Sequence, residues 1–312
     1  MYNHHVGRVF YMELSESVKE WLYECEIRQY TWKTIKGYRN GLELLTNYLK
    51  REQGVTQLEE VQTRHLKAFF MYQIKRERKE TYLNGLLKTY RAFFKYELQE
   101  ENIQTNPVLK VSWMREPKTI IKTFTNEEVK QMMDAYNGKD YISVRNKAIM
   151  AMLFDTGIRC YELCTLTNDC IKENCVVVYG KGKKERQVGK SSYLSKLLLK
   201  YERMREYNFD CKNINQDCYF LSRTGRPLTN AAVERIVKLA GEYANVSDDI
   251  RCSPHTCRHF FAQAQLKNGT DVYSLSRLLG HNNISITQRY LQGLQDNEIV
   301  SKSIETSVLM HL

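Results

Sequence analysis

Hydrophobic residues recur at steps of three and four along the first third of the chain. Three groups keep this spacing, within 35–49, 66–74 and 82–94. Because an α-helix turns once in about 3.6 residues, each group falls on one face of a helix. No stretch from Leu14 to Glu101 shows the alternation or β-branched runs of a strand. The pattern predicts a helical N-terminal domain, which we place at residues 1–108.

A second domain follows a short linker. Asn106-Pro107 ends the helical block, and the stretch 109–122, which carries Pro117, is typical of a linker. Thr125-Asn126-Glu127-Glu128 is a helix-starting capping box, so we place the second domain at 123–295 and a C-terminal tail at 296–312. Helices are predicted near 126–137, 141–155, 191–207, 229–243, 254–268, 272–279 and 285–291.

The second domain also contains one strand pair. Residues 175–179 are short and β-branched, and a Gly-Lys-Gly-Lys-Lys turn separates them from a second strand at 185–188. The predicted fold class is therefore mainly α (α+β), with two helical domains and a small antiparallel sheet in the second.

The chain has an excess of positive charge. Its 312 residues include 47 Lys and Arg against 36 Asp and Glu, which gives a formal charge of +11. This excess favours a polyanion such as DNA or RNA as the partner. An anionic membrane surface is the alternative, but no apolar run of about 18 residues exists to span a bilayer. The nine cysteines are an odd number in a chain without a signal-peptide pattern, so we expect reduced thiols and a cytoplasmic location.

Part of this charge lies on the predicted N-terminal helices. Between Arg64 and Lys95 there are nine Lys and Arg against two Glu, with Tyr72, Tyr82 and Tyr90 interleaved. A solvated helix face explains such a run, and so does a face that follows DNA phosphates, which we favour. The candidate DNA-binding residues are Arg64, Lys67, Lys75, Arg76, Lys88, Arg91 and Lys95.

Residues that can bind phosphate or move protons follow one another along the second domain. Ser253-Pro254 begins a helix on which His255 and Arg258 lie three residues apart, near the end that favours anions. Zinc is an alternative because Cys252, His255, Cys257 and His259 are close in sequence. However, Cys257 faces another side of the helix and His259 is better explained by core packing, so no metal site is predicted.

The remaining candidates are Arg159 with Glu162, Lys181 between two glycines, His281 in a loop, and Tyr290. A capping box at 285–288 predicts that Tyr290 lies in the second turn of its helix. Arginines neutralise phosphate, Lys or His moves protons, and a phenol can attack phosphorus. Since no acidic cluster for magnesium accompanies them, the set indicates metal-free phosphoryl transfer without a cofactor.

Four motifs carry a resemblance to a known family. They are Thr-Gly-Ile-Arg-Cys-Tyr-Glu-Leu at 156–163, Tyr-Gly-Lys-Gly-Lys-Lys-Glu-Arg at 179–186, His-Thr-Cys-Arg-His-Phe-Phe-Ala at 255–262, and Leu-Leu-Gly-His at 278–281 followed by Gln-Arg-Tyr at 288–290. In this order they resemble the tyrosine site-specific recombinase (phage integrase) family. The resemblance covers nearly the whole chain and implies a SAM-like core-binding domain before the catalytic domain.

The resemblance also implies a role for each candidate. Arg159 and Arg258 would bind the scissile phosphate, and Tyr290 would attack it to form a 3′-phosphotyrosyl link. Lys181, for which Lys183 and Lys184 compete, would protonate the leaving 5′ oxygen. His255 would assist proton transfer, His281 would hydrogen-bond a phosphate oxygen, and Glu162 would orient the cluster.

The implied partner is double-stranded DNA at paired inverted half-sites, bound by a homotetramer, with the tail docking on a neighbouring protomer or on its own domain. Tyr290 is followed by Leu-Gln-Gly, which favours a mobile-element integrase or transposon recombinase over a chromosome-dimer-resolving Xer protein. The alternatives are that Xer-like role, a type IB topoisomerase, or a non-catalytic DNA-binding protein.

Overall fold

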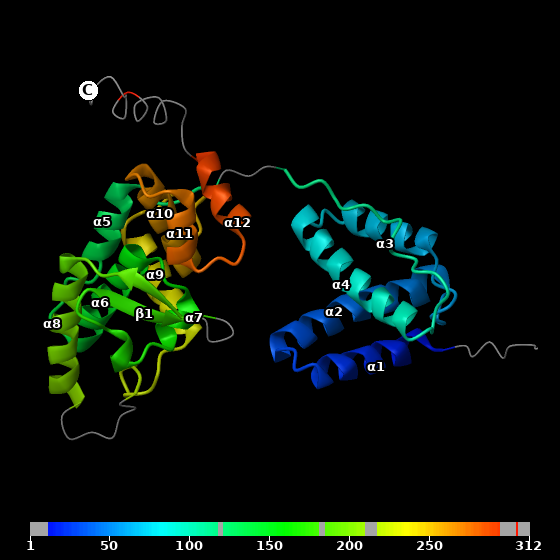
Figure 1. The fold of residues 1–312 in the computed structure, drawn as a ribbon, viewed down its shortest axis with the longest axis horizontal. Helices are drawn as coiled ribbons and strands as arrows, with labels where there is room; N and C mark the ends of the chain where they lie inside the picture. The colour runs from blue at the N-terminus through cyan, green and yellow to red at the C-terminus, as the bar shows by residue number, and fades with distance from the viewer. Residues whose placement is uncertain (1–11, 118–120, 181–184, 210–216, 294–303, 305–312) are drawn as a thin grey trace, which may run out of the picture. The chain divides into compact units, whose positions relative to one another are not determined.

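The computed structural model describes residues 12–117, 121–180, 185–209, 217–293 and 304. Packing divides the chain into two compact units, Met1–Lys118 (unit 1) and Thr119–Leu312 (unit 2) (Figure 1). The described part of unit 1 is helical, and that of unit 2 is mostly helical with one two-stranded antiparallel sheet. The predicted fold class is confirmed.

Unit 1 is built on the apolar spacing seen in the sequence. Its elements are α1 (Leu14–Ile27), α2 (Trp32–Tyr48), the π-helical turn η1 (Leu49–Gln53), α3 (Thr63–Lys75) and α4 (Glu80–Gln99). Leu42, Leu66, Phe69 and Phe93 are at most 1% exposed and belong to one core. Most members of the periodic groups therefore form the interior of unit 1, as expected for amphipathic helices.

Tyr90 belongs to this core and not to the surface. It is fully buried, and its hydroxyl donates a 2.9 Å hydrogen bond to the carbonyl oxygen of Gly41. Tyr82, in contrast, is 47% exposed. The expectation that Tyr90 lines a phosphate-binding face is wrong, because its ring faces the same side of α4 as Phe93 and Phe94.

Much of the predicted linker packs on unit 1. Val111 is buried in the unit 1 core, and the side chain of Asn84 both donates to the Met114 carbonyl and accepts from the Met114 N–H, each at 2.9 Å. Arg91 donates to the Val111 carbonyl at 2.8 Å and stacks on Trp113. Unit 1 therefore extends past 108, because apolar side chains in the stretch after Pro107 find a surface on α4.

Unit 2 has more elements, which surround a buried central helix. They are α5 (Asn126–Asp134), α6 (Tyr141–Thr156), α7 (Cys160–Cys164), η2 (Asn168–Cys170), β1 (Cys175–Tyr179), β2 (Glu185–Gly189), α8 (Ser192–Phe209), α9 (Asn230–Tyr243), α10 (Pro254–Lys267), α11 (Val272–Leu279), α12 (Ile284–Gln288) and the 3₁₀ turn η4 (Arg289–Gly293). Residues 148–153 of α6 are all buried, because α8, α9 and α10 pack around this helix. A helix that is apolar on every side must be covered in this way.

The strand pair and the last helices form the part of unit 2 that carries the candidate site. β1 and β2 pair antiparallel with Val177 opposite Gln187, so the hairpin is the one predicted, and its tip at 181–184 lies outside the described residues. A small separate core joins α10 and α11 to η4 through Phe261, Leu275 and Tyr290.

The prediction for the helix before Tyr290 needs correction. Asn283 caps α12 by accepting from the Ser285 N–H, so Ser285 lies inside the helix and is not its N-cap. The α-helix ends at Gln288, and Tyr290 lies in the 3₁₀ turn η4. The tighter turn coincides with burial of the Tyr290 ring against α10, which the capping pattern alone did not predict.

Candidate active site

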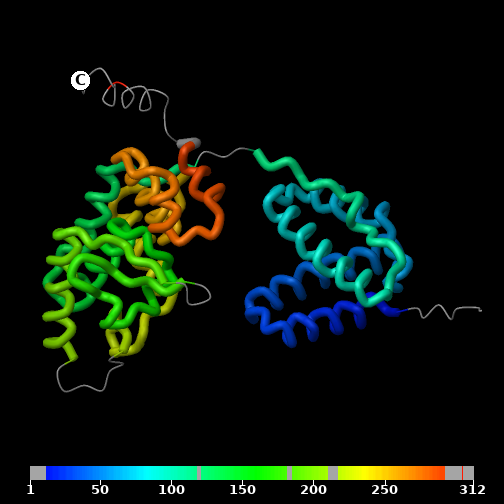
Figure 2. Tube along the Cα trace, in the orientation of Figure 1, coloured from blue at the N-terminus to red at the C-terminus, as the bar shows by residue number. Residues whose placement is uncertain are grey.

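Segments far apart in sequence meet at one end of the α10 helix. The Thr156–Arg159 turn, β2, the start of α10, the loop after α11 and η4 are joined by hydrogen bonds among their polar side chains and backbone. In Figure 2 the orange segment that forms α11 lies next to the green hairpin that contains β2. Arg159 donates to the Gly280 carbonyl at 3.1 Å, and Arg258 donates to the Gly157 carbonyl at 2.7 Å.

A buried carboxylate holds two arginines at this point. Glu162 is 4% exposed and accepts from both terminal nitrogens of Arg186, at 2.8 and 2.7 Å. It also accepts from the Arg159 side chain and backbone N–H, each at 2.9 Å. Burial acts to raise the pKa of Glu162, but the bonds to Arg186 and Arg159 outweigh it, so the pKa lies below its usual value. Glu162 therefore stays ionised and orients both guanidinium groups.

The second candidate arginine is almost completely buried. Arg258 is 2% exposed and donates to the carbonyls of Gly157 and Leu279, which fixes the plane of its guanidinium group. Burial, with the positive charges of Arg159 and Arg186, lowers the pKa of Arg258 to about 9. The group remains charged at neutral pH and lies in surroundings with an excess of positive charge. Such a place favours a bound anion.

His281 lies beside Arg258. Its Nε2 atom is 3.1 Å from the Arg258 Nη2 atom, and its Nδ1 atom is 2.9 Å from the Thr287 hydroxyl oxygen. A guanidinium nitrogen only donates, so Nε2 accepts and the proton of the neutral ring is on Nδ1. Burial and the nearby arginines lower the pKa of His281 to about 4, consistent with a neutral ring.

The candidate nucleophile has a direct partner that the sequence analysis did not identify. Tyr290 is 3% exposed, and its hydroxyl oxygen is 2.9 Å from the Nδ1 atom of His259. Burial raises the pKa of the Tyr290 phenol, although the charges of Arg258, Arg289 and Arg159 act in the opposite direction. The phenol is thus protonated at neutral pH and lies within the field of the arginine cluster.

His255 and His259 lie one turn apart on α10. Their ring centroids are 4.2 Å apart, and His255 is the more exposed of the two. Burial of part of the ring, followed by the charge of Arg258, lowers the pKa of His255. The prediction that His259 serves core packing is incomplete, because its ring meets that of His255 edge to face while Nδ1 contacts the Tyr290 hydroxyl.

Two glycines allow the backbone to approach this cluster. Gly157 has a φ of 59° and Gly280 a φ of 64°, a region that other residues rarely adopt. A Cβ atom on Gly280 would lie 2.9 Å from the Cδ atom of Arg186, and one on Gly157 would lie 2.4 Å from the Phe261 ring. Their carbonyls are the acceptors for Arg159 and Arg258, so both turns shape the site.

Of the six residues predicted from sequence to act in catalysis, Lys181 lies outside the described residues, as do its competitors Lys183 and Lys184. The other five lie in this cluster, although no hydrogen bond joins His255 to the others in the described part of the chain. Arg186 and His259 were missed. Both stand inside motifs already singled out, Lys-Lys-Glu-Arg and Cys-Arg-His, so their position next to candidate residues was the available signal.

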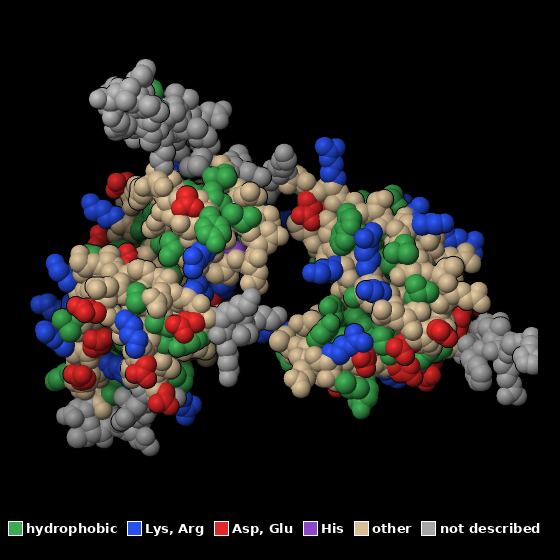
Figure 3. Space-filling view, viewed as in Figure 1, with side chains coloured by type: hydrophobic (Ala, Val, Ile, Leu, Met, Phe, Trp, Pro, Cys, Tyr) green, Lys and Arg blue, Asp and Glu red, His purple; other side chains and the backbone are tan. Residues whose placement is uncertain are grey.

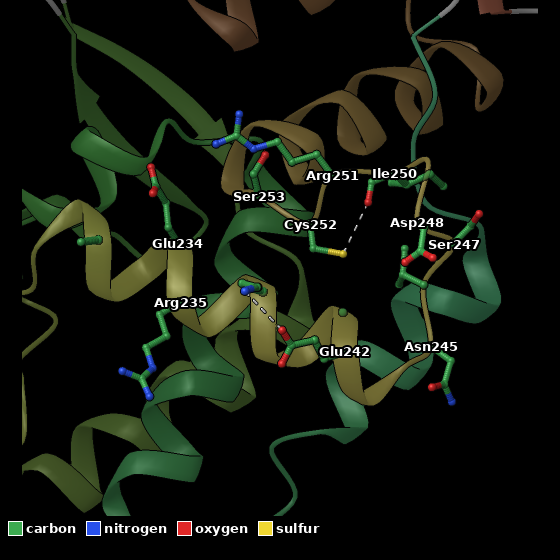
Figure 4. Close-up of a pocket in the computed structure, with 14 residues that line it drawn as sticks. Glu234, Arg235, Glu242, Asn245, Ser247, Asp248, Ile250, Arg251, Cys252 and Ser253 are labelled. Atoms are coloured by element: carbon green, nitrogen blue, oxygen red, sulfur yellow. Dashed lines mark hydrogen bonds and ion pairs between the residues drawn. The ribbon is translucent and has the colours of Figure 1, made fainter.

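The cysteines considered for zinc point away from the histidines. Cys252 lies at a surface cleft of about 750 Å³ between α9 and the loop before α10, where its thiol faces the Ile250 carbonyl (Figure 4). Cys257 is buried in the main core of unit 2. Among the described residues no three His, Cys, Asp or Glu side chains converge as metal ligands. His255 and His259 are thus separated from both thiols.

The candidate DNA-binding residues of unit 1 differ in exposure. Arg64, Lys67, Lys75, Arg76, Lys88 and Lys95 are exposed, and Arg91 is half-buried against the 111–113 segment. In Figure 3 basic side chains spread over the part of unit 1 formed by α3 and α4, and acidic ones gather towards α1. α1 carries Glu16, Glu20, Glu24 and Glu26. Unit 1 is therefore electrostatically two-sided.

Comparison with known proteins defines the family. A model described as "Phage integrase family" matches residues 122–296, and one described as "Phage integrase, N-terminal SAM-like domain" matches residues 18–101. The chain belongs to the phage integrase family of tyrosine recombinases, as its motifs predicted. It is accordingly an enzyme that cleaves and rejoins DNA in site-specific recombination.

Two curated relatives are tyrosine recombinases named XerC. The protein of Bacillus pumilus (strain SAFR-032) is 30% identical over 274 residues, which cover 86% of this chain and 89% of the relative. That of Thermodesulfovibrio yellowstonii is 32% identical over 261 residues, covering 82% and 84%. The similarity therefore extends through both units.

Solved structures share the fold. The XerH site-specific recombinase bound to palindromic difH substrate matches with a TM-score of 0.74 and 17% identity, covering 93% of this chain and 84% of that one. The Tn1549 transposon integrase in complex with a circular intermediate DNA matches with a TM-score of 0.72 and 16% identity, covering 95% and 100%. Within the described residues, no helix has the length and apolar character needed to cross a membrane.

Proposed function

We propose that the cluster around the start of α10 cuts DNA with Tyr290 as the nucleophile, leaving a 3′-phosphotyrosyl link and a free 5′ hydroxyl. The observation that supports this proposal most strongly is that Arg159, Arg258, His281 and Tyr290 converge in one part of unit 2. Glu162 and two glycine turns hold the arginines there. A 5′ hydroxyl from a partner duplex reverses the step. One phosphodiester replaces another, so the exchange needs no external energy source.

The two arginines would bind the scissile phosphate. The side chain of Arg159 is 41% exposed although it pairs with the buried Glu162, so its open side is available to a non-bridging oxygen. Arg258 supplies a second positive charge that cannot move, because two carbonyls hold it. Charge that is already in place stabilises the transition state without reorganisation.

His281 would hydrogen-bond a phosphate oxygen. In the structure its Nε2 atom accepts from Arg258, so a bound phosphate would compete for that guanidinium and add a negative charge beside the ring. Both changes favour a proton on Nε2, which would then be the donor. His255, exposed at the start of α10, is proposed to assist proton transfer.

Lys181 is proposed as the acid that protonates the leaving 5′ oxygen. In sequence it stands between β1 and β2, and β2 is tied to the site because Arg186 donates to both Glu162 and the Leu278 carbonyl. Arg186 thus connects the hairpin to the phosphate-binding residues.

We further propose that unit 1 binds the DNA backbone through α3 and α4, using Arg64, Lys67, Lys75, Arg76, Lys88 and Lys95. The names of the similar structures describe complexes with DNA, which supports double-stranded DNA as the partner. Paired inverted half-sites and a homotetramer are part of the same proposal, since exchange joins two duplexes with four cuts. The tail at 296–312, proposed to dock on a neighbouring protomer, lies outside the described residues apart from Ile304.

A role in the movement of a mobile element is supported by the likeness to a transposon integrase and by the sequence after Tyr290. The relatives named XerC equally support a resolvase role. The domain assignment, with core binding at 1–108, a linker at 109–122 and catalysis at 123–295, is part of this proposal. If packing is taken as the criterion, the boundary between the core-binding domain and the linker moves from 108 to Lys118.

The proposal is tested with a nicked DNA site, from which the cut strand diffuses away and leaves the enzyme trapped. The natural site is first found by sequencing the ends of the element or the DNA beside the gene. Wild-type protein should form a covalent complex that survives denaturant, and Tyr290→Phe should bind equally well and form none. Tyr161→Phe, an exposed tyrosine outside the cluster, is the matched control and should trap normally.

An adduct that persists in Tyr290→Phe would overturn the assignment of the nucleophile. The same assay on single and paired half-sites tests the assembly. Trapping that is no better on a pair of inverted half-sites would argue for a monomeric, topoisomerase-like reaction.

A further inference from the structure

The contact between His259 and Tyr290 is unexplained by the roles assigned above. The two atoms are 2.9 Å apart, Tyr290 is 3% exposed, and the pair is formed between α10 and η4. His259 is the described side chain that hydrogen-bonds the phenol oxygen. His255, the residue predicted to assist proton transfer, reaches His259 only through its ring, with no hydrogen bond to Tyr290.

This contact involves the atom that must react. A phenol is a poor nucleophile until it loses its proton, and burial raises the pKa of Tyr290 further. A base must therefore take the proton as the oxygen attacks, and a candidate base should lie within about 2.6–3.2 Å of the hydroxyl. The Nδ1 atom of His259 meets this distance.

The imidazole is also in the required protonation state. Burial, together with His255, Arg258, Arg289 and His281, lowers the pKa of His259 to about 4. The ring is neutral at physiological pH, so one nitrogen is free to accept a proton. A DNA phosphate would offset the charges of Arg258 and Arg289 and so make the ring more basic than in the free protein.

We propose that His259 is a catalytic residue, the general base that accepts the Tyr290 proton during strand cleavage. The inference rests on the proposed nucleophilic role of Tyr290. The Tyr290 O–H bond breaks as its oxygen bonds to phosphorus, the proton moves to Nδ1 of His259, and the P–O5′ bond breaks. The leaving oxygen takes its proton from the acid proposed at Lys181. During rejoining, His259 returns its proton to the tyrosine as the phosphotyrosyl bond breaks.

The experiment compares two replacements of His259. The amide oxygen of asparagine can occupy the position of Nδ1 and accept the hydroxyl, but it cannot take up the proton. His259→Asn and His259→Ala should both slow trapping on the nicked site by about 10²–10⁴-fold. If His259 only positions the Tyr290 ring, the cleavage rate of His259→Asn should stay near that of the wild type.

Rescue by a more acidic nucleophile separates a base from a structural residue. A fluorinated tyrosine placed at 290 by codon reassignment forms its phenolate at lower pH. It should restore most of the lost rate in His259→Ala, because the missing base is then no longer needed. It should not rescue Lys181→Ala, which should respond instead to a 5′-bridging phosphorothiolate whose thiolate leaves unaided.

The pH profile supplies an independent readout. With unmodified Tyr290, cleavage by His259→Ala should rise with pH more steeply than wild type, since phenolate must form without a base. The charged and titratable groups facing His259, namely His255, Arg258, Arg289 and His281, are the same in both proteins. Melting curves and DNA binding establish that each variant is folded.

Three results would overturn the proposal. The first is a cleavage rate near wild type in His259→Asn. The second is that fluorotyrosine at 290 fails to rescue His259→Ala. The third is that fluorotyrosine rescues His255→Ala and not His259→Ala. These three results are measured only after Tyr290 has been shown to form the covalent adduct. Failure of the proposed function gives a different result, because Tyr290→Phe would then still form the adduct.

Discussion

At the residue scale, the site depends on arginines that a buried carboxylate and backbone carbonyls hold in place. Glu162 holds Arg159 and Arg186, and backbone carbonyls hold Arg258. An unpaired buried charge is costly, so each partner keeps the others in place. The two glycine turns also hold the arginines in place, since the Gly280 carbonyl accepts from Arg159 and the Gly157 carbonyl accepts from Arg258.

Gly280→Ala is the sharpest residue-scale test of this arrangement. A residue with a side chain pays about 1–2 kcal/mol in the left-handed region, and the new Cβ would press on Arg186. Displacing Arg186 and the Gly280 carbonyl should slow trapping at least about tenfold. DNA binding should change less than cleavage.

Gly189→Ala is the matched control, because no atom lies within 4 Å of a Cβ there and its φ is not left-handed. Equal cleavage rates for Gly280→Ala and Gly189→Ala would show that the turn does not position the arginines.

The candidate residues were predictable from sequence to different degrees. Arg159, Arg258 and Tyr290 could be named as candidates because each stands in a motif with a chemical reason for its residue type. The contact of His259 with Tyr290 could not be predicted, since the place of His259 beside Arg258 in the Cys-Arg-His motif says nothing of a partner until η4 brings Tyr290 to it.

At the element scale, α3 and α4 combine an apolar face in the core with basic side chains on the surface. Periodicity predicted most of this apolar face, Tyr90 included, but Ile74 and Tyr82 share the spacing and are 46% and 47% exposed. Arg91 shows a second departure, because its side chain holds the 111–113 segment by a hydrogen bond and by stacking on Trp113.

The salt dependence of DNA binding distinguishes basic residues that contact phosphate from those, such as Arg91, that hold the fold of unit 1. Replacing Lys67, Lys88 or Lys95 singly by Gln should weaken DNA binding and lower the slope of log affinity against log salt by about one unit per lost phosphate contact. Lys19→Gln on the acidic α1 helix is the control and should leave the slope unchanged. Arg91→Gln should mainly lower the melting temperature, and slopes that stay constant for all three lysines would remove α3 and α4 from the DNA interface.

At the scale of the whole molecule, two units with separate cores share one chain, and unit 2 contains a site with an excess of positive charge. This excess makes stability depend on pH. The pKa values of His259 and His281 are lowered from 6.5 to about 4 in the folded protein. Between pH 6.5 and about pH 4 the unfolded chain binds more protons at these histidines than the folded chain does, so lowering the pH favours unfolding.

The melting temperature should therefore fall as the pH is lowered from 7 towards 4, with no loss above about pH 7 from these groups. Thermal unfolding followed by circular dichroism at steps of pH checks this. A double variant, His259→Asn with His281→Asn, should show a shallower fall across the same window. Identical slopes for the two proteins would mean that other groups control acid stability.

The sequence by itself determined the helical class, the division into two units, the hairpin and the family. These follow from local causes: apolar spacing, capping residues, prolines and short motifs whose chemistry is readable along the chain. Only the tertiary structure decided that residues beyond 108 pack on α4 and that Tyr290 lies in a 3₁₀ turn against His259. Each of these depends on contacts between segments distant in sequence, and packing of that kind overrides local preference because burial of apolar surface outweighs the propensity of one turn.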